Sequence, residues 1–128
     1  MDGFHDLHVR REGQPDLRLP VLLEHDRGTE REQAFKRKIA AYRALLQSGA
    51  FKEQYNVGNI TILFTTFTDM KRVAELRKWT WDEVQNDQTV YGRFRFTRLP
   101  SSPEPRHLLF EPRWCTLVSD QPVALLGE

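Results

Sequence analysis

The chain has 128 residues, of which 39% are hydrophobic and 29% are charged, and its formal net charge is +1. This balance predicts one globular domain over residues 1–128 and excludes a chain that is disordered throughout. No apolar stretch approaches the roughly 20 residues of a membrane span, and the N-terminus lacks a signal-peptide pattern. The single cysteine excludes an internal disulfide and a cysteine-rich zinc site. We therefore expect a cytoplasmic protein.

The first 25 residues predict an antiparallel hairpin. Apolar and polar residues alternate over residues 4–10 and again over residues 17–25, which is typical of half-buried strands. The polar segment between them contains Gly13 and Pro15, whose backbone preferences favour a reversal of the chain.

A long helix is predicted to follow the hairpin, from about Thr29 to Ser48. Thr29 and Glu32 have the spacing of a capping box, and Gly49 follows Ser48 where the helix should stop. Four residues at spacings of four, three and four would form its inner face: Phe35, Ile39, Tyr42 and Leu46.

The rest of the chain predicts a strand, a helix and another strand. β-branched and aromatic residues fill 60–66, Asp69 is placed to cap the next helix, and alternation returns over 90–97. The inner side of that helix would carry Val73, Leu76 and either Trp79 or Thr80. Residues 100–106, rich in proline and serine, predict a flexible loop. The order of elements predicts an α/β domain without repeats.

Three carboxylates are predicted to approach one another at one end of the hairpin. Asp2 precedes the first strand, and Glu24 and Asp26 end the second on the same face, because they are two residues apart. Such oxygens bind Mg²⁺ or Mn²⁺ while leaving positions for water and phosphate. Asp16, in the turn, is the fallback ligand. Acidic pairs at strand ends are also common as purely structural features, and that alternative stays open.

Basic residues cluster in two segments. Arg27, Arg31 and Lys38 lie in the first, while Arg93 and Arg95 share one face of the last predicted strand. Both clusters are candidates for contacts with DNA phosphates. Such clusters are equally typical of a solvated surface.

One run of residues is specific enough to suggest a family: Glu24-His25-Asp26-Arg27-Gly28-Thr29-Glu30. Supporting patterns are Asp2-Gly3-Phe4, Lys38 with Tyr42, Ile62-Leu63-Phe64-Thr65-Thr66, and Arg72. With these residues the chain resembles the nuclease-like domain of replication-relaxation proteins of plasmids. The resemblance implies a restriction-endonuclease-like (PD-(D/E)XK) fold, a mixed sheet flanked by helices. The usual first helix and strand of that fold would be absent, so the domain would be truncated at its N-terminus.

The resemblance also implies roles for the candidate residues. Asp2 and Glu24 would hold Mg or Mn, and Asp26 would ligate the metal or orient water. Lys38 would replace the motif lysine, because Asp26 stands where that lysine belongs.

Three functions follow as hypotheses: a metal-dependent DNA nickase, a non-catalytic DNA-binding accessory of a relaxosome or replication complex, and a protein-interaction module. DNA and other relaxosome or replication proteins would be the partners. Because a truncated sheet exposes a strand edge, we also expect a homo-oligomer.

Overall fold

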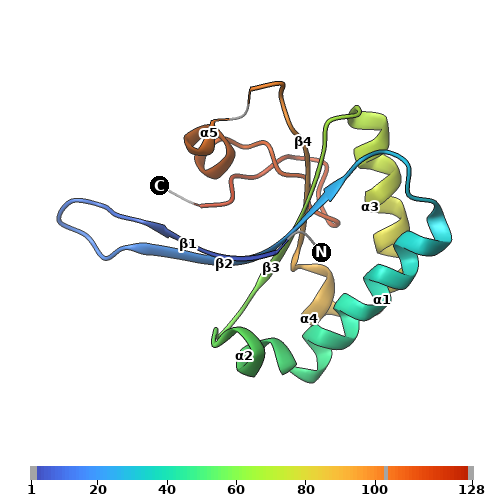
Figure 1. Ribbon diagram of the computed structural model, residues 1–128, viewed down its shortest axis with the longest axis horizontal. Helices are drawn as coiled ribbons and strands as arrows, with labels where there is room; N and C mark the ends of the chain where they lie inside the picture. Colours follow the sequence, from blue (N-terminus) through green and yellow to red (C-terminus); the bar gives the residue numbers. More distant parts are fainter. Residues whose placement is uncertain (1–2, 103, 127–128) are drawn as a thin grey trace.

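The computed structural model describes residues 3–102 and 104–126, and it contains a four-stranded mixed sheet with helices on both faces (Figure 1). The strands are β1 (Gly3–Val9), β2 (Leu17–Asp26), β3 (Thr61–Thr66) and β4 (Phe94–Arg98), in that spatial order. β1 is antiparallel to β2, whereas β2, β3 and β4 are parallel. The helices are α1 (Glu32–Ser48), α2 (Ala50–Tyr55), α3 (Met70–Val84), α4 (Gln88–Tyr91) and α5 (Pro105–Phe110). The expected α/β class is confirmed.

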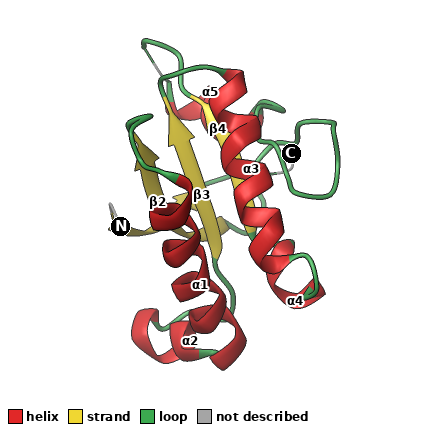
Figure 2. Ribbon diagram, turned by 90° about the vertical axis from the view of Figure 1, so that its right-hand side faces the viewer, coloured by secondary structure: helices red, strands yellow, loops and turns green. Residues whose placement is uncertain are grey.

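Two layers cover the sheet. α1 and α3 lie side by side on one face, and α5 with the segment after it lies on the other (Figures 1 and 2). The outer half of the β1–β2 hairpin extends away from these layers (Figure 1). The parallel strands all end at the same edge of the sheet, which we call the carboxyl edge.

The larger core fills the space between the sheet and the α1–α3 layer. Alternate strand residues point into it, and the rings of Phe64 and Phe96 stack there with centroids 5.3 Å apart. A smaller cluster on the opposite face contains Val21, Leu63 and Trp114. β3 is buried on both faces, as expected for a central parallel strand.

Several sequence predictions are confirmed. β1 pairs with β2 from Gly3 opposite Leu23 to Val9 opposite Leu17. The predicted inner face of α1 is buried at Phe35, Ile39 and Tyr42, with Leu46 packed at its margin. Asp69 caps α3, because its side chain accepts a hydrogen bond of 2.8 Å from the Arg72 backbone N–H. Val73, Leu76 and Thr80 are buried on the inner side of α3.

The predicted start of the first helix at Thr29 is wrong. α1 begins at Glu32, and its N-cap Arg31 is extended and makes no side-chain cap hydrogen bond. The preceding residues are used elsewhere. The Glu30 carbonyl accepts a hydrogen bond from Arg72, and its carboxylate bonds Lys38. These tertiary contacts outweigh the local capping box.

The predicted strand over 90–97 begins too early. Asp87 accepts hydrogen bonds from Thr89, and its carbonyl accepts from Val90 and Tyr91, so a short helix α4 forms first. Residues 90 and 92 therefore continue the apolar–polar alternation of β4 only by chance, although Val90 is buried. α2 and α5 are additional helices. α5 begins at Pro105, whose fixed φ favours a first helical turn, so the loop expected over 100–106 ends earlier.

None of the helices in the described residues is long and apolar enough to cross a membrane.

A backbone test follows from Gly28, which has a φ of +82° just after β2. A Cβ atom there would lie 2.7 Å from Thr68 Oγ1, whereas one at Gly49, with a φ of +72°, meets nothing within 4 Å. We expect Gly49→Ala to lower the free energy of unfolding only by the cost of the left-handed conformation, about 1–2 kcal/mol. Gly28→Ala should lower the free energy of unfolding, measured by urea denaturation, by more than this, because its Cβ would also clash with Thr68. Equal losses would show that the approach to Thr68 has no energetic consequence.

Candidate functional site

Glu24 and Asp26 lie at the carboxyl end of β2 and point toward the helices. The alternation of the strand places them on the same face as Leu22, and both are nearly buried, at 5% and 9% exposure. They pair in register with Phe64 and Thr66 of β3. The prediction that the two carboxylates share one face is therefore confirmed.

Asp26 forms a buried ion pair with Arg72 of α3. The Arg72 Nη2 donates to Oδ1 at 2.8 Å and Nε donates to Oδ2 at 2.9 Å, the two-pronged geometry that suits a guanidinium. The Gly28 N–H donates to Oδ2 at 3.1 Å. Burial by itself would raise the pKa of Asp26. The hydrogen bonds and charge of Arg72, together with hydrogen bonds from Thr66 and Gly28, outweigh burial, so the pKa of Asp26 lies below its usual value.

Arg72 also fastens the loop between β2 and α1. Its Nη2 donates to the Glu30 carbonyl at 2.9 Å, and its Nη1 donates to Glu75. The guanidinium carbon lies 5.1 Å from the centroid of the Trp79 ring, within cation–π range. One side chain thus connects a strand, a loop and a helix. The pKa of Arg72 is raised, and its hydrogen bonding to Asp26 is the largest cause.

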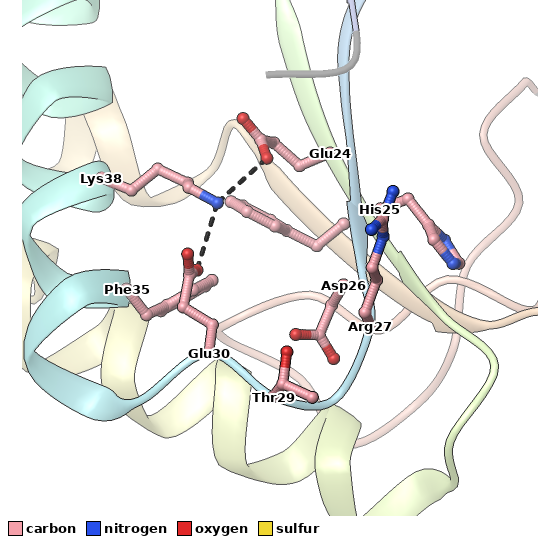
Figure 3. Close-up of a pocket in the computed structure, with 9 residues that line it drawn as sticks. Glu24, His25, Asp26, Arg27, Thr29, Glu30, Phe35 and Lys38 are labelled. Carbon is pink, nitrogen blue, oxygen red and sulfur yellow. Dashed lines mark hydrogen bonds and ion pairs between the residues drawn. The ribbon is translucent and has the colours of Figure 1, made fainter.

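Lys38 of α1 lies between two carboxylates (Figure 3). Its Nζ is 3.2 Å from Glu24 Oε2 and 3.1 Å from Glu30 Oε1. The Tyr42 hydroxyl donates to the other oxygen of Glu24. Burial alone would lower the pKa of Lys38, but Glu30 and Glu24 raise it above its usual value. Lys38, which the resemblance implied in place of the motif lysine, therefore contacts Glu24.

A polar cavity of about 160 Å³ lies where these groups meet. Its lining includes the carboxylates of Glu24, Asp26 and Glu30 and the cations Arg27 and Lys38, and Phe35 closes its apolar side (Figure 3). This volume admits a few water molecules or a small ion rather than a nucleotide.

The donor set does not fit a divalent ion held jointly by Glu24 and Asp26. Both oxygens of Asp26 accept hydrogen bonds from Arg72, and both oxygens of Glu24 accept from Tyr42 or Lys38. Metal ligation needs these lone pairs and this negative charge. Within the described residues no group of three or more potential ligands is placed to hold a metal.

The other predicted ligands differ in position. Asp2 lies outside the described residues; Gly3 is the first described residue and pairs with Leu23. Asp16, the fallback, precedes β2 at its other end. Eight residues separate it from Glu24, which is roughly 26 Å along a strand. Asp16 as a partner of Glu24 is therefore a wrong prediction, because the strand between them is fully extended.

The predicted DNA-contacting arginines lie at two opposite ends of the sheet. Arg27 and Arg31 are exposed in the β2–α1 loop, at the carboxyl edge. Arg93 precedes β4, and Arg95 is its second residue, near the amino end of that strand. Arg95 donates to the carbonyls of Gly92 and Phe94, and burial lowers its pKa. The two groups therefore do not form one surface.

Sequence reasoning assigned no role to Arg72, which proves to be the main partner of Asp26. A signal was present, because Arg72 shares a helical face with Leu76 and Thr80 at steps of four. An arginine on the buried face of a helix needs an acidic partner, and Asp26 is nearly buried on the facing strand.

Residues 2–61 match the model of the replication-relaxation family. The match supports the resemblance noted from the sequence, and it covers just under half of the chain. It contains the Glu24–Glu30 run, whereas Arg72 lies outside it. The comparisons with curated proteins and with solved structures gave no significant match.

The ion pair makes a prediction about stability and pH. Asp26→Asn leaves Arg72 buried beside a neutral group, so we expect a loss of about 3–5 kcal/mol in unfolding free energy at pH 7. The folded-state pKa of Asp26 is lowered, so its contribution exists above the unfolded pKa of about 3.9. It is lost as the pH falls through the folded pKa.

Denaturant titrations of wild type and Asp26→Asn between about pH 2 and pH 8 measure this dependence. The difference between the two should be constant near neutrality and shrink below about pH 4. Asp6→Asn is the control, because the pair of Asp6 with Arg18 lies on the surface and should contribute much less. A difference that does not change with pH would contradict the assignment.

Proposed function

We propose that this chain is a DNA-binding domain of a replication-relaxation protein, in which Glu24 and Asp26 support the β2–α1 loop without performing catalysis. The observation that carries the proposal is that the internal cations Lys38 and Arg72 engage both carboxylates. The same cations also bind Glu30 in the loop itself. The carboxylates therefore serve to hold the loop in place.

The loop presents positive charge at the edge of the sheet where α/β domains commonly bind ligands. Arg27 and Arg31 are exposed, and among the described residues neither forms an ion pair with a carboxylate. Arg98 is exposed at the end of β4, which lies at the same edge. Unpaired guanidinium groups on a fixed loop suit contacts to phosphates.

Binding of labelled oligonucleotides, followed by fluorescence anisotropy over a range of salt concentrations, tests the proposal. Arg27→Gln and Arg31→Gln should each weaken binding and reduce the slope of log affinity against log salt by about 1. Lys52→Gln is a matched control, because Lys52 is exposed on α2 at the other end of the sheet. Equal effects in all three variants, or no binding by wild type, would overturn the proposal.

A second candidate is a metal-dependent nickase with a restriction-endonuclease-like site. One observation favours it: a carboxylate and a lysine, Glu24 and Lys38, meet in a cavity that opens to solvent. Against it, the oxygens of Asp26 are occupied by Arg72. Other replication or relaxosome proteins, and a second copy of the chain, remain the expected partners under either function.

Nicking of supercoiled plasmid with Mg²⁺ or Mn²⁺ separates the two functions. Under our proposal, wild type and Glu24→Gln give the same background of nicked product. An activity that is present in wild type, depends on the metal and is lost in Glu24→Gln would make the nickase the better assignment. Tyr42→Phe removes a neighbour of Glu24 without removing the carboxylate, so it controls for general disturbance of the cavity.

A further inference from the structure

Two large apolar side chains are exposed at the carboxyl edge, although Phe64, Phe94 and Phe96 of the sheet are buried. Phe67, directly after β3, is 55% exposed, and Met70, at the start of α3, is 54% exposed. Phe67 begins the short connection between β3 and α3, and Met70 follows it. Covering an exposed ring removes apolar surface from water, so Phe67 is a candidate for contact with a ligand.

The ring of Phe67 is held in a defined position. It packs against the His25 ring with centroids 4.7 Å apart and an interplanar angle of 63°. His25 Nδ1 is 2.9 Å from Thr65 Oγ1, which ties the imidazole to β3. On the other side of the connection, Thr66 Oγ1 accepts a hydrogen bond from the Thr68 N–H. Phe67 is therefore presented by an ordered turn.

Arginines lie at the ends of both neighbouring strands, Arg27 directly after β2 and Arg98 as the last residue of β4. Thr66, the residue before Phe67, pairs with Asp26 of β2 and with Arg98 of β4. Arg27 follows Asp26, so it leaves β2 where Phe67 leaves β3, about one strand spacing of 4.8 Å away. Figure 3 shows the His25 ring on the side of β2 opposite to Glu24 and Asp26. Arg98 shares the register and the sheet face of Thr66, whereas Phe67 packs on the face of His25, so Arg27 is the exposed cation beside the ring.

We propose that Phe67 is a stacking platform for an unpaired base of single-stranded DNA, with the neighbouring Arg27 contacting a phosphate. This inference rests on the proposed DNA-binding function and adds the form of DNA that is bound. An exposed ring beside a cation is a combination that binds single strands, because a phosphate meets the charge and a free base covers the ring. In a duplex the base faces are already stacked, so Phe67 would contribute little to duplex binding.

Anisotropy with a single-stranded oligonucleotide and with the same sequence as a duplex tests this assignment. Phe67→Ala should weaken single-strand binding by about 5- to 100-fold, the range for one stacked base, and change duplex binding less than 2-fold. Phe67→Trp should retain single-strand binding. Phe67→Leu, which stays apolar but lacks the ring, should lose it. Because Phe67 is exposed, these variants should fold normally.

Val118→Ala is the matched control, since Val118 is 61% exposed on the segment that Arg77 of α3 holds. Equal single-strand affinity in wild type and Phe67→Ala would overturn the platform. Retained single-strand binding in Phe67→Leu would also overturn it, because stacking on a base needs the ring. If wild type binds duplex and single strand with no dependence on Phe67, only this inference fails. If wild type binds neither, the proposed function fails as well.

Discussion

The buried pair of Asp26 and Arg72 is the interaction on which the arrangement of the carboxyl edge depends. It joins the end of β2 to the first turn of α3, and through the Glu30 carbonyl it also fixes the loop that leads into α1. Removing two charges from water is costly, and the cost is recovered only when the hydrogen bonds are complete. Here Gly28 and Glu75 complete them. The position of α3 against the sheet and the path of the β2–α1 loop are therefore coupled.

That coupling gives a structural reason for most polar residues in the run from Glu24 to Glu30. Asp26 needs Arg72, Gly28 needs a left-handed backbone, and Glu30 supplies both a carbonyl and a carboxylate to buried cations. Some residues of this run take no part in these internal contacts and are exposed. Arg27 is one of them, and it points to solvent at the edge where an α/β sheet usually meets its ligand.

The same carboxylates would suit a nuclease if they were accessible to a metal, so the sequence motif alone does not distinguish a catalytic site from a scaffold. What distinguishes them is the balance of charge around the oxygens. Lys38 binds two of the carboxylates and Arg72 binds a third, so hydrogen bonds to internal cations already occupy oxygens that a divalent ion would need. The replication-relaxation match over residues 2–61 is compatible with both uses of the motif.

The sequence by itself determined the features that depend on local periodicity. Alternation at a period of two predicted the hairpin and the common face of Glu24 and Asp26, and a helical period predicted the buried face of α1. The tertiary structure decided the partners of the carboxylates, because Arg72 is 46 residues from Asp26 and meets it only when α3 packs on β2. It also moved the start of α1, since contacts of Glu30 with distant cations outweigh a capping box. Local patterns report which way a side chain points, whereas the charge it meets depends on the packing of distant elements.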